Sequence, residues 1–192
     1  CYLAEAVIAP LRADGVRIDA RAFELRPAPM PLPSMEKPYY RTSWERGVLP
    51  LAERLGVHGM RRPVFATRTR KAHEAVCFAR EHDADDALRH ALYEAYFVEQ
   101  RDIGRIDVLV GIGAAVALEP LALKVALDVD KYTGQVVAQE AEAQRLGVTV
   151  VPAQLVPGAD GVGRIMMGVR TTDELRALLA AGNSARIHGE DE

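Results

Sequence analysis

Cysteine is scarce in this sequence, which contains only Cys1 and Cys77 among its 192 residues. The two cysteines stand far apart in the chain, and the histidines are not spaced as a metal-binding set around either of them. Because zinc and related metals need clustered Cys and His ligands, the sequence predicts no metal site. Cys77 lies among apolar residues at helical spacing in "HEAVCFAREH", which favours a buried, unreactive thiol.

The chain also lacks an excess of positive charge and a long apolar run. Its formal net charge is -3 and its pI is near 6.0, which argues against a nucleic-acid partner, since such proteins usually carry a basic patch. The one basic run, Arg61 to Lys71, is interpreted as a solvated helix face. No apolar segment reaches the roughly 20 residues of a membrane span. No signal peptide is visible either, so we expect a cytoplasmic protein, with a leader ahead of Cys1 left open.

The first residues predict a helix followed by a strand. Leu3, Val7 and Leu11 recur at positions i, i+4 and i+8, as the apolar stripe of a helix does, and Pro10 should kink this helix or end it early. Residues 16–22 then alternate between apolar and charged side chains, which is the period-two pattern of a strand.

A proline-rich segment separates this start from a long helical region. Residues 26–38 hold five prolines and predict a loop or an extended connector. Helical periodicity then continues to residue 147, with a break near Pro50 and with Pro120 in the first turn of its helix.

The last third of the chain predicts a β-hairpin and a final helix. Residues 147–156 ("GVTVVPAQLV") are rich in β-branched side chains and predict a strand, although Pro152 cannot donate to a sheet ladder. Residues 162–168 predict its hairpin partner. A helix should begin at Thr171 or Thr172 and end near Gly182. Strands near both ends with helices between them indicate an α/β domain interrupted by a helical insertion.

Three segments of the sequence resemble the DsbA superfamily, and in particular its FrnE-like thiol–disulfide oxidoreductases. "CYLAE" is similar to the end of the family's C-P-W-C-Y-[LI] active site. Thr67 to Gly104 is similar to the helical insertion of that family, including an aromatic pair before "RDIG". "AEAQRLGVTVVPAQLV" is similar to its A-x-E-x-G-V-x-G-V-P segment.

This resemblance implies a thioredoxin-like fold with an inserted all-helical domain. The thioredoxin-like core would comprise residues 1–37 and 148–182, the insertion residues 38–147, and the tail residues 183–192. The first strand of the fold is missing from the sequence; we expect it to precede Cys1, and the alternative is that another chain supplies it.

The resemblance also implies the site residues. Cys1 matches the second, resolving cysteine of a C-x-x-C motif, whose partner would stand three residues earlier. Pro152 matches the family's cis-proline, so Val150, Val151 and Pro152 would bind an extended substrate by strand pairing. His73 has a counterpart in the insertion motif and could face the active-site groove. The partners would be protein or small-molecule thiols and disulfides, with no cofactor beyond the redox cysteines, and a homodimer is left open.

Several positions depart from the family pattern. Val150 stands where a glycine is usual, Ala153-Gln154 replaces Thr-Phe, "GVR" (residues 168–170) replaces G-A-Q, and Arg68 replaces an asparagine. These departures concern substrate contacts rather than the fold.

Two other functions remain open. A glutathione-dependent isomerase or kappa-class transferase shares the insertion and the cis-proline, and "YLA" after Cys1 fits it, but that group carries serine where Cys1 stands. Cysteine three residues before Cys1 would indicate redox chemistry, and serine would indicate glutathione chemistry. The third alternative is a non-catalytic module that binds extended peptides at Val151 and Pro152.

Overall fold

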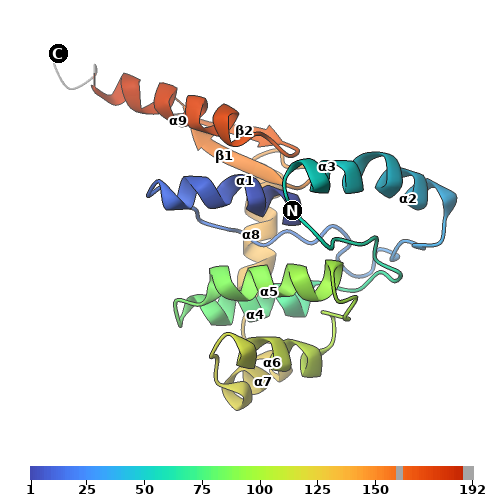
Figure 1. Ribbon diagram of the computed structural model, residues 1–192. Helices are drawn as coiled ribbons and strands as arrows, with labels where there is room; N and C mark the ends of the chain where they lie inside the picture. The colour runs from blue at the N-terminus through green and yellow to red at the C-terminus, as the bar shows by residue number, and fades with distance from the viewer. Residues whose placement is uncertain (159–161, 188–192) are drawn as a thin grey trace. The chain divides into compact units, whose positions relative to one another are not determined.

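The structure is a computed structural model that describes residues 1–158 and 162–187, with side chains described up to residue 181. The chain divides into two compact units (Figure 1). One, here called the Cys1 unit, comprises Cys1–Ala20 and Glu142–Glu192, and the other, the helical unit, comprises Arg21–Ala141. The sequence had placed the boundaries at 37/38 and 147/148 instead.

Helix α1 (Tyr2–Ala13) begins the Cys1 unit. Leu3, Val7 and Leu11 are all buried, as their spacing predicts. Pro10 does not end this helix, which continues to Ala13, so the expected early end was wrong. Its side chain lies on the exposed face of α1, and the carbonyl oxygen of Pro10 still accepts from the N–H of Asp14 over 3.0 Å.

Strands β1 (Ala153–Pro157) and β2 (Gly163–Met167) form the predicted antiparallel hairpin, in which Ala153 faces Met167. The expected strand start at Gly147 was wrong. Gly147 has a φ of +81° and, with Val148, caps the end of helix α8 (Thr133–Arg145). The N–H groups of Gly147 and Val148 donate to the carbonyls of Gln144 and Ala143, both over 2.9 Å, in a Schellman arrangement.

Helix α9 (Thr172–Ile187) follows the hairpin and contacts β1 and α1. Thr171 is its N-cap, as expected: its hydroxyl accepts from the N–H of Glu174 over 3.2 Å, and the Glu174 carboxylate accepts from the N–H of Thr171 over 2.8 Å. The helix continues past Gly182, where we had expected it to end. Residues 188–192 of the expected tail lie outside the described residues.

The strand predicted over residues 16–22 was wrong, because no strand is assigned there. The exposure of these side chains does alternate, as the pattern indicated. However, the backbone hydrogen bonds go elsewhere: the N–H of Val16 closes the end of α1 on Leu11, and that of Ala22 donates to the side chain of Gln139. The alternating sequence pattern therefore reflects the alternating burial of these side chains rather than pairing in a sheet.

The helical unit is built from α4 (Arg70–Arg80), α5 (Asp85–Phe97), α6 (Ile106–Ala115), α7 (Pro120–Asp128) and most of α8 (Figure 1). Helix α4 contacts α5, α6 and α7. The core of the helical unit consists of small and aliphatic side chains from these helices, among them Ala75, Leu88, Leu109, Leu123 and Val136. Gly113 lets α6 approach α7 closely, because a Cβ there would lie 2.5 Å from Cδ2 of Leu123.

A second helical stretch in this unit runs from α2 (Pro38–Ser43) through a π-helical turn, η1 (Trp44–Val48), into α3 (Leu49–Arg54). The predicted break near Pro50 is this π-helical turn, which lies directly before α3. Pro50 has no N–H to donate, and the preceding π-turn shifts the bonding so that the N–H of Leu49 reaches the carbonyl of Trp44. The axis therefore continues without a loop.

Within the described ranges, the helices are all too short or too polar to cross a membrane.

Candidate functional site

Cys1 occupies the N-cap position of α1 and its side chain is exposed. Its carbonyl oxygen accepts the first helical hydrogen bonds, from the N–H of Ala4 over 2.9 Å and from that of Glu5 over 3.2 Å. The partial positive charge of a helix N-terminus favours a thiolate over a thiol. The local structure thus places the Cys1 sulfur at the N-terminal end of α1.

The residues behind Cys1 fix this end of the helix. Tyr2, Leu3 and Ala4 are all buried, so the first turn of α1 is anchored in the Cys1 unit. The hydroxyl of Thr172 at the start of α9 donates to the carbonyl oxygen of Val7 over 2.9 Å. This bond ties the beginning of α9 to the middle of α1.

The segment before β1 carries the three predicted substrate-binding residues. The Val151–Pro152 peptide bond is cis. Val150 is 50 % exposed, and Val151 and Pro152 are half-buried. Within residues 1–158 and 162–187, the N–H and C=O groups of Val151 have no hydrogen-bond partner. Free backbone groups of this kind can pair with an extended chain.

The carbonyl oxygen of Pro152 is satisfied, because it accepts from the N–H of Gly168 over 2.8 Å. This bond closes the end of the hairpin opposite its turn. Cys1 and Pro152 both belong to the Cys1 unit. The packing of Pro152 against Cys1 stays a prediction.

Cys77 has the opposite environment. It lies on α4 in the helical unit and is 5 % exposed, which confirms the interpretation of a buried cysteine. Burial raises the pKa of its thiol, with smaller effects from charged groups including Arg80 and Glu74. A thiol with a raised pKa is a poor nucleophile near neutral pH.

His73 is half-buried on α4. Burial lowers the pKa of its imidazole to about 4, an effect opposed by a hydrogen bond to the backbone of Phe23 and reinforced by the charge of Arg70. The imidazole is therefore neutral at neutral pH. Its predicted place in the active-site groove stays a prediction, since the bonded partner identified here is a backbone group of its own unit.

Sequence reasoning missed Arg170 as a site residue. Arg170 is two residues beyond Gly168, and its guanidinium donates to the carbonyl oxygen of Met167 over 3.2 Å. Its buried Nε has no hydrogen-bond partner among the described residues. The signal was the departure of "GVR" from the G-A-Q pattern, which places a cation beside the Pro152 segment.

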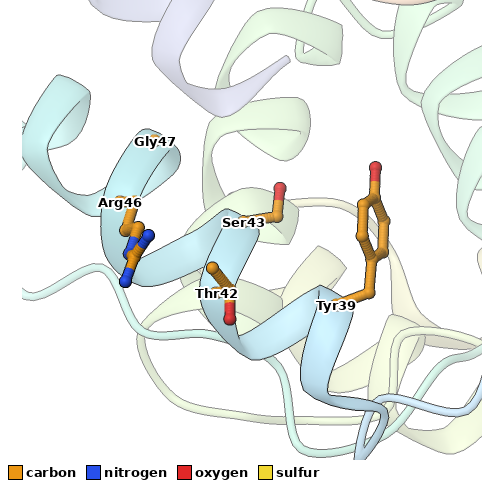
Figure 2. Close-up of a pocket in the computed structure, with 5 residues that line it drawn as sticks. All are labelled: Tyr39, Thr42, Ser43, Arg46 and Gly47. Carbon is orange, nitrogen blue, oxygen red and sulfur yellow. The ribbon is translucent and has the colours of Figure 1, made fainter.

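A hollow of about 400 Å³ lies elsewhere, on the helical unit, lined by Tyr39, Thr42, Ser43, Arg46 and Gly47. Figure 2 shows that these residues all come from one helical stretch and that the side chains among them point in different directions. Small-molecule sites usually hold polar groups that converge. The hollow contains none of the predicted site residues. No group of His, Cys, Asp and Glu side chains suited to a metal ion occurs in the part of the chain that the structure describes.

Comparison with known proteins places this architecture in a family. The model of the DsbA-like thioredoxin domain matches residues 1–180. The chain therefore belongs to the DsbA-like thioredoxin domain family, a family of thiol–disulfide oxidoreductases and isomerases, as its sequence resemblance implied. The fold is accordingly thioredoxin-like, mostly helical with a small sheet, which confirms the predicted fold class. The narrower FrnE-like assignment stays a prediction.

Individual relatives match most of the chain, by sequence or by structure. The uncharacterized protein YwbO of Bacillus subtilis (strain 168) is 28% identical over 171 residues, covering 84% of this chain and 85% of that protein. The probable DsbA oxidoreductase SCO1869 from Streptomyces coelicolor superimposes with a TM-score of 0.76 at 24% identity, over 97% of this chain and 84% of that one.

Two further solved structures represent different chemistries on this fold. A 2-hydroxychromene-2-carboxylate isomerase has a TM-score of 0.71 at 16% identity and covers all of this chain, with 93% of its own matched. The cytosolic disulfide reductase DsbM from Pseudomonas aeruginosa, solved with GSH, has a TM-score of 0.65 at 16% identity, over 99% of this chain and 92% of that one.

Proposed function

We propose that this protein is a thiol–disulfide oxidoreductase in which Cys1 is the resolving cysteine of a C-x-x-C motif. The observation that carries the proposal is the contrast between the two thiols. Cys1 is exposed at a helix N-terminus in a DsbA-like domain, whereas Cys77 is buried with a raised pKa. Of these two cysteines, Cys1 is the one whose sulfur could reach a mixed disulfide without unfolding of the helix that carries it.

The reaction would proceed by two exchanges. The motif's first cysteine, three residues before Cys1, attacks a substrate disulfide as a thiolate, forms a mixed disulfide and releases one substrate thiolate. The Cys1 thiolate then attacks the mixed disulfide, which releases the second substrate thiolate and leaves an intramolecular disulfide. Two electrons pass from the enzyme to the substrate, and the reverse sequence oxidises a dithiol.

Substrate binding would use the open backbone beside Pro152. The N–H and C=O of Val151, which have no partner in the described part of the chain, are suited to an extended peptide lying against them, and the half-exposed side chain of Val150 borders this edge. Backbone pairing recognises chain conformation rather than side chains, so this edge suits a range of protein disulfides.

Substitution of Cys1 tests the proposal directly by trapping. In full-length Cys1→Ser protein, the motif's first cysteine should still attack a substrate disulfide. The mixed disulfide would then persist, because the thiol that resolves it is gone. A mixed disulfide with insulin should then accumulate and disappear on adding dithiothreitol, as seen on a non-reducing gel. Cys77→Ser, the control, should trap nothing beyond the wild-type level. Absence of any trapped species with Cys1→Ser contradicts the proposal.

A second candidate is chemistry on glutathione itself. Two observations favour it: a cytosolic disulfide reductase with the same fold was solved with GSH, and Arg170 offers a guanidinium for the carboxylates of such a thiol. The same comparison supports a cytoplasmic location. If glutathione reduces the C-x-x-C disulfide, this second candidate is compatible with the first proposal. A serine three residues before Cys1 would instead indicate isomerase or transferase chemistry in place of thiol–disulfide exchange.

A further inference from the structure

Helix α7 is apolar on two opposite faces. One face packs into the core of the helical unit and consists of Leu123, Ala126 and Leu127. On the other face, Leu121, Val125 and Val129 recur at positions i, i+4 and i+8 and are 67%, 52% and 66% exposed. We call these three residues the α7 stripe. A helix that is apolar all round is normally buried all round, so a second surface is expected to cover the stripe.

The two long edges of the α7 stripe differ in charge. At the start of the helix, the Glu119 carboxylate is turned back onto α7, where it accepts from the N–H groups of Leu121 and Ala122 as the N-cap. At 100° per residue, the small exposed side chain of Ala122 borders one edge of the stripe. Lys124 and Asp128 border the other edge and form an ion pair with each other. The stripe is therefore apolar along its length, with one small edge and one charged edge.

We propose that the α7 stripe is the interface of a homodimer, in which α7 of one copy packs antiparallel against α7 of a second copy. A two-fold interface must be complementary to itself. The stripe meets this condition, because Leu121 and Val129 stand four residues on either side of Val125. In the antiparallel pair, the Val125 side chains of the two copies meet at the two-fold axis, and Leu121 of each copy meets Val129 of the other.

The charged edge determines the direction of the pairing. A two-fold axis between antiparallel helices brings like edges together, so Lys124 of each copy lies beside Asp128 of the other. A parallel pair would instead place the charged edge of one copy against the Ala122 edge of the other. Exposed ion pairs add little affinity but fix orientation, and the apolar contact supplies the binding. Because one short helix makes a small interface, we expect a dimer Kd on the order of 10 µM.

Sedimentation velocity of the full-length protein over about 1–300 µM measures this dimer, with dithiothreitol present so that intermolecular disulfides do not contribute. Val125→Glu places two carboxylates together at the axis and should raise the dimer Kd at least about tenfold. Val64→Glu is the matched control, because Val64 is 64% exposed but lies outside the stripe, and it should leave the Kd within about twofold. Lys124→Glu should raise the Kd at least about threefold, and adding Asp128→Lys should restore it, since each edge then carries both signs of charge again.

A protein that stays monomeric over the whole range overturns the proposal, whichever other surface covers α7. A dimer that Val125→Glu leaves intact, or that Val64→Glu weakens equally, also overturns it. If Asp128→Lys fails to recover the affinity lost by Lys124→Glu, the antiparallel arrangement is wrong. Circular dichroism and urea unfolding of each variant separate loss of the dimer from loss of the fold. If Val125→Glu does not fold, Lys124→Glu, at a 55% exposed side chain, and its double variant decide alone.

Discussion

The N–H of Gly168 donates to the carbonyl oxygen of Pro152 over 2.8 Å, and this bond ends the pairing of the β-hairpin. Val151, one residue earlier, lies beyond the ladder and keeps both backbone groups unpaired among the described residues. Arg170, two residues after Gly168, brings an incompletely bonded guanidinium to the same end of the hairpin. An open backbone edge and a cation therefore lie together on the unit that carries Cys1.

Methylation of a peptide nitrogen tests backbone pairing without altering the protein. A cysteine-containing peptide that loses one N–H at the residue facing Val151 should bind more weakly by about 1 kcal/mol, or roughly fivefold in Kd, the net value of one hydrogen bond. A scan of single N-methyl positions, measured by titration calorimetry, should show the loss at alternate residues, because only every second residue of an extended strand faces a given edge. Equal losses at all positions, or none, would contradict strand pairing.

Arg170 should contribute to binding of anionic thiols. Arg170→Met is expected to raise the Kd for glutathione roughly tenfold, since a charge-assisted hydrogen bond contributes about 1.5–3 kcal/mol. Arg170→Lys, the matched control, keeps the positive charge but not the bidentate geometry of the guanidinium, so its affinity for glutathione should fall less than that of Arg170→Met. The wild-type affinity should also fall with added salt more steeply than that of Arg170→Met. Identical affinities for all three proteins would remove Arg170 from the site.

The α6–α7 contact offers a paired test of packing. Gly113→Ala should destabilise the protein by about 1–3 kcal/mol, because the new methyl group would overlap Leu123 in a filled core. Gly111→Ala on the same helix meets only the end of the Arg101 side chain at 3.7 Å and should stabilise by about 0.5–1 kcal/mol, as alanine favours helix. Urea unfolding measures both. Equal changes in the free energy of unfolding for the two variants would mean that α6 and α7 do not approach this closely.

His73 predicts a pH dependence of stability. Its folded-state pKa of about 4 lies below the ordinary histidine value of 6.5, so the neutral imidazole stabilises the fold above pH 6.5. That contribution, up to about 3 kcal/mol for such a difference, is lost as the pH falls from 6.5 towards 4. The unfolding free energy of wild type relative to His73→Gln should therefore decrease over this range. His90→Gln, at a 56% exposed side chain, is the control; a pH-independent difference for His73 would contradict the assignment.

The sequence predicted the fold class, the first helix, the hairpin and the N-cap of the last helix, because each rests on local signals such as apolar spacing and capping residues. It failed where tertiary contacts decide. Residues 16–22 alternate like a strand, yet Ala22 bonds to Gln139, which is distant in the sequence. Gly147 looked like the start of a strand but caps α8, because its positive φ is the conformation that ends a helix, and the sequence does not record φ.

Of the candidate site, Cys1 and Pro152 came from resemblance to a family, and spacing alone did not single them out. Arg170 left a signal in the sequence, the departure of "GVR" from G-A-Q, but its buried Nε without a partner among the described residues and its bond to the carbonyl of Met167 came from the structure. The predicted roles of Val150, Val151 and His73 depend on a bound substrate and stay predictions.

Turnover by full-length protein carrying either Cys1→Ser or Cys77→Ser tests the central claim most directly. Insulin reduction with dithiothreitol as the electron donor, followed by turbidity, gives the rate above the uncatalysed background. We expect Cys77→Ser to retain the wild-type rate within about twofold and Cys1→Ser to lose at least about 90% of it, because resolution of the mixed disulfide requires the second thiol. Loss of turnover in Cys77→Ser with full turnover in Cys1→Ser would contradict the account.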